Sequence, residues 1–184
     1  MTAYIGCDPA TDRGAGAVVG LDDDLSPCWV LDWRRNTFHF RDGEQHTSGK
    51  GRPFALSALE GALDLGCPAA VESVTYRKGA RRGVLNLALA AGWWSGVLLA
   101  ERATYAEWTR AVLLERPGTT VKAHEAACRR AAGVSPMGLV RVPVRWPLTW
   151  PEWAPTHPHA LDAAGLALYA AGCRASVDAP GAAE

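Results

Sequence analysis

The chain has 184 residues, 48% of them hydrophobic, which is enough for one sizeable core but short for two full domains. We therefore expect a single domain over residues 1–173 and a disordered tail over residues 174–184. Basic and acidic residues number 19 each, so the net charge does not indicate a polyanionic partner, and a nucleic-acid surface would require local clusters of cations.

The five cysteines are scattered along the chain, odd in number and without a Cys-x-x-Cys pair. This pattern argues against a disulfide framework and against a zinc site, and it is typical of buried thiols in a reducing compartment. No apolar run reaches about 18 residues, and no basic segment followed by an apolar one opens the sequence. We therefore expect a cytoplasmic protein without membrane association.

The first elements are short strands. An apolar run over residues 4–8 ends in Asp8, and the glycine-spaced residues 14–19 complete an antiparallel pair. A third strand is predicted over residues 28–33, followed by a polar, solvated loop over residues 34–53. A carboxylate inside a sheet is costly unless cations or donors hold it, so a turn cap is the simpler interpretation of Asp8 taken alone.

A second carboxylate follows in a similar setting. Residues 54–65 have apolar side chains at helical spacing and precede a short strand over residues 69–74. A crossover helix places that strand parallel to the first. Small apolar neighbours of Glu72 indicate a sheet covered on both faces, which would bring Glu72 beside Asp8.

A basic turn follows this strand, with four cations and one aromatic ring: Tyr76, Arg77, Lys78, Arg81 and Arg82. Such a cluster suits phosphates and an unpaired base, although a solvated helix start is the simpler alternative. Cations in the first turn of a helix interact unfavourably with the positive end of the helix dipole. A bound phosphate would offset this cost, so the position of these cations favours the phosphate interpretation. The long apolar helix over residues 81–102 should be central or carry one face into a partner subunit.

The second half of the chain is predicted to contain a fifth strand over residues 104–108 and helices over residues 109–115 and 119–130. We expect Arg110 and Lys122 to extend the phosphate-binding surface and His124 to be a surface residue. Residues 133–155 carry five prolines and three tryptophans, which predicts a loop packed by aromatic rings.

The last helix is predicted over residues 156–170. His159 and Asp162 stand at positions i and i+3 on one face, so both side chains could reach one ion. Considered alone, this helix is better explained by an Asp that satisfies the helix dipole and an exposed His.

Together these features resemble the RuvC-type Holliday-junction resolvases and their phage relatives, within the ribonuclease H-like nucleases. The resemblance rests on Asp8 and Glu72 near the ends of two strands, a basic turn before a long Ala/Leu helix, and the closing motif His159-Ala-Leu-Asp162-Ala-Ala. It implies an α/β fold with a mixed five-stranded sheet, three strands antiparallel and then two parallel, flanked by helices on both faces. It also implies a homodimer that cuts two opposed strands of a four-way DNA junction.

By the same resemblance, Asp8, Glu72, His159 and Asp162 occupy the positions of catalytic metal ligands. Tyr76 lies near the family's junction-probing aromatic residue, and Lys122 where a basic residue approaches the cleaved phosphate. Residues 33–53 and 134–155 depart from the common bacterial pattern, which leaves open a preference for flaps, forks or other branched DNA.

The chemistry is consistent with this set of residues. Phosphodiester hydrolysis requires an activated water and charge neutralisation, which two Mg²⁺ ions about 4 Å apart supply. Carboxylate oxygens suit Mg²⁺, and His159 is better suited to Mn²⁺ as a substitute, or to orienting the attacking water. Two other interpretations stay open: a junction-binding module that does not cut DNA, and a small ATP-binding protein of the actin-like and sugar-kinase group.

Overall fold

The computed structural model describes residues 1–9, 16–33, 35, 37–40, 43–46, 66–74, 82–116, 118–134 and 144–175. The predicted helix over residues 54–65 and most of the predicted tail, residues 176–184, lie outside these ranges. So do four residues of the predicted basic turn, Tyr76, Arg77, Lys78 and Arg81, and the side chain of Arg82.

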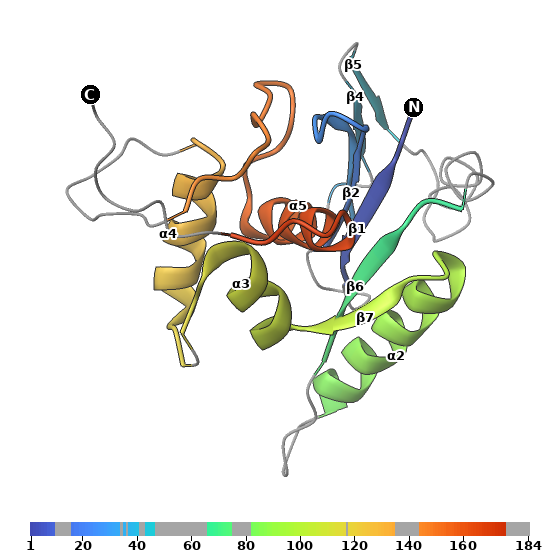
Figure 1. The fold of residues 1–184 in the computed structure, drawn as a ribbon. Coiled ribbons are helices and arrows are strands. Elements are labelled where there is room, and N and C mark those ends of the chain that lie inside the picture. Colours follow the sequence, from blue (N-terminus) through green and yellow to red (C-terminus); the bar gives the residue numbers. More distant parts are fainter. Residues whose placement is uncertain are drawn as a thin grey trace, which may run out of the picture.

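The fold is a mixed α/β arrangement built on one seven-stranded sheet, in the order β5-β4-β3-β2-β1-β6-β7 (Figure 1). Strands β1 to β5 form an antiparallel meander, whereas β6 and β7 run parallel to β1. The strands are β1 (Tyr4–Asp8), β2 (Ala17–Leu21), β3 (Pro27–Asp32), β4 (Thr37–Phe40), β5 (Gly43–His46), β6 (Ala69–Ser73) and β7 (Glu101–Thr104).

The predicted count of five strands was wrong. The predicted core of three antiparallel and two parallel strands is present as β3-β2-β1-β6-β7, but β4 and β5 extend the sheet within the segment predicted as a loop. Strand β4 forms because Phe38 is almost fully buried and its ring packs 5.2 Å from that of Trp29 on the neighbouring strand. Such aromatic cross-strand pairs stabilise a strand. The polar residues around Phe38 had led to the prediction of a loop at this position.

Helices cover both faces of the sheet (Figure 1). Helices α3 (Tyr105–Leu113), α4 (Val121–Ala131) and α5 (Pro158–Ala170) share one hydrophobic core with one face, while α2 (Arg82–Val97) packs on the other. Among the described residues, no helix combines the length and the apolar character needed to cross a membrane.

The boundaries around β7 differ from the prediction. The helix predicted over residues 81–102 ends at Val97, and the predicted fifth strand lies earlier, at Glu101–Thr104. Thr104 caps α3: its side chain accepts a hydrogen bond from the backbone of Glu107, whose carboxylate accepts one from the backbone of Thr104. This capping box starts a helix where alternating residues predicted a strand.

The central helix of the fold is α5. A Cβ atom at Gly6 would lie 1.9 Å from the carbonyl oxygen of Ala163 and 2.3 Å from the nitrogen of Ala167, so α5 rests directly on the backbone of β1. Helix α2, in contrast, leaves Leu85 and Leu89 exposed. We expected this helix either to be central in the fold or to carry one face into a partner subunit. The two exposed leucines exclude the central position.

Candidate functional site

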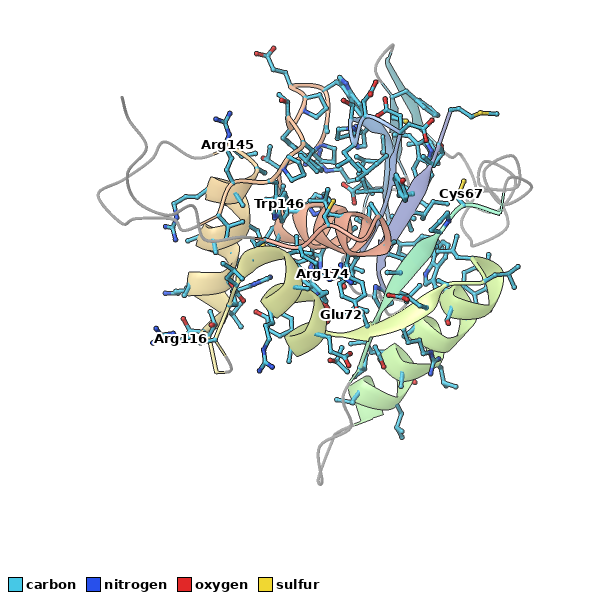
Figure 2. The ribbon with its side chains drawn as sticks, in the orientation of Figure 1. Cys67, Glu72, Arg116, Arg145, Trp146 and Arg174 are labelled. Carbon is cyan, nitrogen blue, oxygen red and sulfur yellow. The ribbon has the colours of Figure 1, made fainter. Side chains whose placement is uncertain are left out.

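Two of the predicted site carboxylates come from neighbouring parallel strands. Cys7 of β1 pairs with Val71 of β6, so Asp8 and Glu72 are the next residues on strands that lie about 4.8 Å apart. Both follow the alternation that puts Gly6 and Ala70 on the face covered by α5, so their side chains point to this same face. Figure 2 labels Glu72 near the end of β6.

The other two predicted residues approach from α5. Nδ1 of His159 lies 2.5 Å from Oδ2 of Asp8. Asp162 follows one turn later, and its charge raises the pKa values of Asp8 and Glu72. The structure therefore brings Asp8, Glu72, His159 and Asp162 together, although they are distant in the sequence.

The start of α5 explains this placement. His157 is the N-cap residue, and its Nδ1 accepts a hydrogen bond from the backbone of Ala160. Pro158 occupies the first helical position, where its missing N–H costs nothing. The cap fixes where the helix begins, so His159 falls in the first turn and Asp162 at the start of the second.

Burial and mutual repulsion govern the charges of the carboxyl groups. Burial raises the pKa of Asp8 to about 6, and the hydrogen bond from His159 opposes this shift. Burial and the neighbouring Asp8 charge raise the pKa of Glu72 to about 7. The hydrogen bond to Asp8 raises the pKa of His159 despite burial. A divalent cation among these groups would offset the repulsion between them, so Asp8, Glu72 and Asp162 fit a hard metal that prefers oxygen.

Two helices hold these carboxylates from behind. Nε1 of Trp108, which is fully buried on α3, donates a hydrogen bond of 2.9 Å to Oε2 of Glu72. On α4, Nε2 of His124 lies 2.9 Å from Oδ1 of Asp162, and its Nδ1 lies 3.0 Å from Oε2 of Glu115. Glu72 and Asp162 are thus each oriented by a group that the prediction did not assign to the site, whereas Asp8 contacts the predicted His159.

The prediction that His124 is a surface residue was wrong, because it is only 4% exposed. Thr120 caps α4, and the resulting helical phase places His124, Cys128 and Ala131 on the buried side. Their spacing of four and three residues is the sequence pattern that could have identified the buried stripe.

A further acidic residue was missed. Asp32 ends β3, is 1% exposed, and pairs with Ala17, which in turn pairs with Asp8. Oδ2 of Asp32 lies 3.5 Å from Nε2 of His157. Like Asp8, Asp32 ends an apolar strand, and that shared position could have revealed it.

The predicted phosphate-binding cations are not assembled into one surface by the described residues. Arg110 and Lys122 are exposed on α3 and α4, the helices that flank the acidic cluster. The basic turn follows β6 in the sequence but lies outside the described residues. These residues remain predicted DNA contacts.

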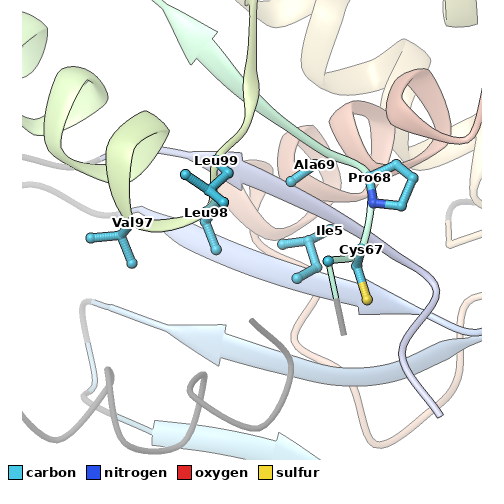
Figure 3. A pocket seen from close by; sticks show the side chains of 8 residues that line it. Ile5, Cys67, Pro68, Ala69, Val97, Leu98 and Leu99 are labelled. Carbon is cyan, nitrogen blue, oxygen red and sulfur yellow. The ribbon is translucent and has the colours of Figure 1, made fainter. Parts of the chain in front are cut away.

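An apolar pocket lies elsewhere and does not resemble a reactive site. It measures about 210 Å³ and lies at the opposite end of β6 from Glu72, lined by Ile5, Cys67 and Leu98 among others (Figure 3). None of the described residues that line it carries a charged side chain. We therefore place the candidate site at the carboxylates.

Comparisons with known proteins give little further guidance. No protein-family model and no curated protein matches the sequence. Among solved structures, T. thermophilus RuvC in complex with a Holliday junction substrate is similar, with 17% identity and a TM-score of 0.39, covering 94% of this chain and 99% of that chain. The function is therefore argued from the site itself.

Proposed function

We propose that this chain is a metal-dependent DNA endonuclease with a ribonuclease H-like fold that resolves four-way junctions by paired nicks. One observation carries the proposal: Asp8, Glu72 and Asp162 come from three separate elements, the charge of Asp162 contributes to the raised pKa values of the other two, and His159 contacts Asp8. Partly buried carboxylates grouped in this way need a compensating charge, and a divalent cation would supply it in a form useful for phosphate chemistry.

The four residues would hold two Mg²⁺ ions, or Mn²⁺ in their place. Bound there, the metal ions activate water and neutralise charge on the phosphate and the leaving oxygen. The protein contributes orientation: Trp108 holds one oxygen of Glu72, and His124 holds one oxygen of Asp162. Because Trp108 and His124 are buried, these contacts would restrict how the two carboxylates turn when a substrate arrives.

Substrate recognition is assigned to the predicted cations and to a second subunit. Tyr76 would stack on an unpaired base, while Arg77, Lys78, Arg81, Arg82, Arg110 and Lys122 would contact phosphates. The exposed Leu85 and Leu89 of α2 give a second copy of the chain an apolar surface to cover. A symmetric dimer would present two sites to two opposed strands.

The test is cleavage of a labelled four-way junction in the presence of Mg²⁺ or Mn²⁺, beside flaps, forks and linear duplex. We expect symmetric paired nicks in the junction. Asp8→Asn and Asp162→Asn should abolish cleavage while binding persists, whereas Asp23→Asn, in an exposed turn, should cut normally. Junction binding without any cleavage by the unmodified protein would instead identify a non-cutting binding module.

A further inference from the structure

Three metal-binding atoms of different chemistry meet between α4 and α5. Nε2 of His124 lies 2.9 Å from Oδ1 of Asp162, and Sγ of Cys128 lies 3.5 Å from each of these two atoms. His124 and Cys128 are four residues apart on α4, so they share one helical face. Both are buried, at 4% and 0% exposure.

The spacing of the three atoms is close to that of zinc ligands. Around a tetrahedral Zn²⁺ with usual bond lengths, a nitrogen and an oxygen lie about 3.4 Å apart and a sulfur lies about 3.6 Å from each of them. Only the separation between His124 and Asp162 must widen, by about 0.5 Å, to admit the ion. A rotation of the Asp162 side chain, which is partly exposed, can supply this change.

Glu115 gives the histidine the support that zinc ligands usually have. Both of its oxygens lie within 3.1 Å of Nδ1 of His124. A neutral His124 that donates its Nδ1 hydrogen to Glu115 presents its Nε2 lone pair to a metal. This carboxylate–histidine–metal arrangement fixes the tautomer and the orientation of the ring.

We propose that His124, Cys128 and Asp162 form a binding site for Zn²⁺, with a fourth position open to water and Glu115 as the positioning residue behind His124. This site would bind a different kind of metal ion from the nuclease site, because a thiolate and an imidazole select a softer ion than Mg²⁺. It contradicts the expectation, drawn from cysteine spacing, that the chain has no zinc site. The interaction would join α4 to α5.

Metal binding exchanges protons for the ion. The thiol of Cys128 loses its proton to become a thiolate, and His124, if protonated at Nε2, loses that proton too; both pass to solvent. The acidic group Asp162 is shared with the proposed nuclease site, but its contacts with His124 and Cys128 both use Oδ1.

The test uses Co²⁺ as a spectroscopic probe, added to the full chain in excess Mg²⁺. Co²⁺ bound to a thiolate gives a near-ultraviolet charge-transfer band, and tetrahedral coordination gives intense visible bands. We expect one equivalent of Co²⁺ to produce both and one equivalent of Zn²⁺ to remove them. Cys128→Ser should eliminate the charge-transfer band, whereas Cys173→Ser, at a half-buried position after α5, should retain it.

Two further variants separate this site from the nuclease site. Asp8→Asn should keep the charge-transfer band even though the nuclease proposal requires it to lose cleavage. Glu115→Gln should weaken Co²⁺ binding about 10- to 100-fold, while the control variant Glu125→Gln, within α4, should not. A band that survives Cys128→Ser, or that is lost in Asp8→Asn, would overturn the proposal.

A measurement on the unmodified chain covers the case in which Cys128→Ser does not fold. X-ray absorption of the protein loaded with one equivalent of Zn²⁺ should show one sulfur at about 2.3 Å and nitrogen or oxygen ligands at about 2.0 to 2.2 Å. A first shell without sulfur would overturn the assignment.

Discussion

At the scale of single residues, two carboxylates of the site, Glu72 and Asp162, contact side chains of the helices behind them. Trp108 donates to Glu72, and His124 contacts Asp162. A buried carboxylate that loses its donor keeps the cost of its own desolvation. The sequence did not identify these positioning residues. A tryptophan or histidine in an amphipathic helix is predicted only to be buried or exposed, and its partner depends on how the helix packs against the rest of the fold.

Trp108→Phe tests the first contact. The ring is retained in part, but the hydrogen bond to Glu72 is lost, so we expect weaker Mg²⁺ binding and a loss of about 1 to 3 kcal/mol in the free energy of unfolding. Calorimetric Mg²⁺ titration and chemical denaturation measure the two effects. Trp150→Phe is the matched control, because the buried Nε1 of Trp150 has no hydrogen-bond partner among the described residues. Equal Mg²⁺ affinity in the Trp108 variant and the unmodified protein would contradict this role.

The raised pKa values predict how stability depends on pH. The pKa values of Asp8 and Glu72 are about 6 and about 7 in the folded chain, against 3.8 and 4.5 for free groups. Between the pKa of each free group and its raised pKa in the folded chain, the folded state binds more protons than the unfolded state. The free energy of unfolding therefore falls as pH rises through this interval. The raised pKa of His159 likewise makes the free energy of unfolding fall as pH rises, because the folded chain holds this proton more tightly than the unfolded chain does.

We therefore expect the free energy of unfolding of the metal-free protein to decrease from about pH 5 to about pH 8. Urea denaturation in the presence of a chelator measures it. Glu72→Gln should flatten the profile, because an amide does not titrate. Stability that increases over this interval would contradict the assignment of buried, mutually repelling carboxyl groups.

At the scale of elements, the sequence predicted most accurately what periodicity and chain order control. The first strand, β6 and the final helix lie where they were predicted, because short apolar runs and helical spacing identify them. The second strand, predicted over residues 14–19, lies two residues further along at its end, at Ala17–Leu21. The prediction failed at β4, where a buried aromatic pair outweighs a polar composition, and at Thr104, where a capping box starts α3. Both failures arise from contacts that single-residue preferences do not contain.

Gly6→Ala tests the contact between β1 and α5. The new Cβ would meet backbone atoms of α5, which cannot rotate away, so we expect a loss of about 3 kcal/mol or more in the free energy of unfolding. Gly96→Ala in α2 meets nothing within 4 Å and should be neutral or stabilising by up to about 1 kcal/mol. Urea denaturation of both variants decides; a Gly6 variant as stable as the unmodified chain would contradict the close packing.

At the scale of the whole molecule, the balanced net charge gives no sign of the acidic side chains that β1 and β6 place next to each other. The family resemblance predicted Asp8, Glu72, His159 and Asp162 as one set, and the structure places them near one another at β1, β6 and α5, whereas composition alone gave no indication of them. The helices behind them could not be assigned, because contacts across 36 or more residues depend on how the layers pack.

The exposed apolar face of α2 predicts a dimer. Leu85→Lys combined with Leu89→Lys should convert the dimer to a monomer, because two charges would have to be buried at the interface. Light scattering coupled to size exclusion measures the mass. Val121→Lys, an exposed apolar position on α4, should leave the mass unchanged. A monomeric unmodified protein would contradict the proposed second copy.

The backbone contact at Gly6 also limits how the site can choose among ions. Since α5 touches the backbone of β1 at Gly6, the helix cannot move closer to the sheet to reach a small cation. Discrimination by ionic radius must therefore come from side-chain rotamers of Asp8 and Asp162 on a rigid frame. Such a frame would favour an ion that demands strict coordination geometry over one that accepts many arrangements.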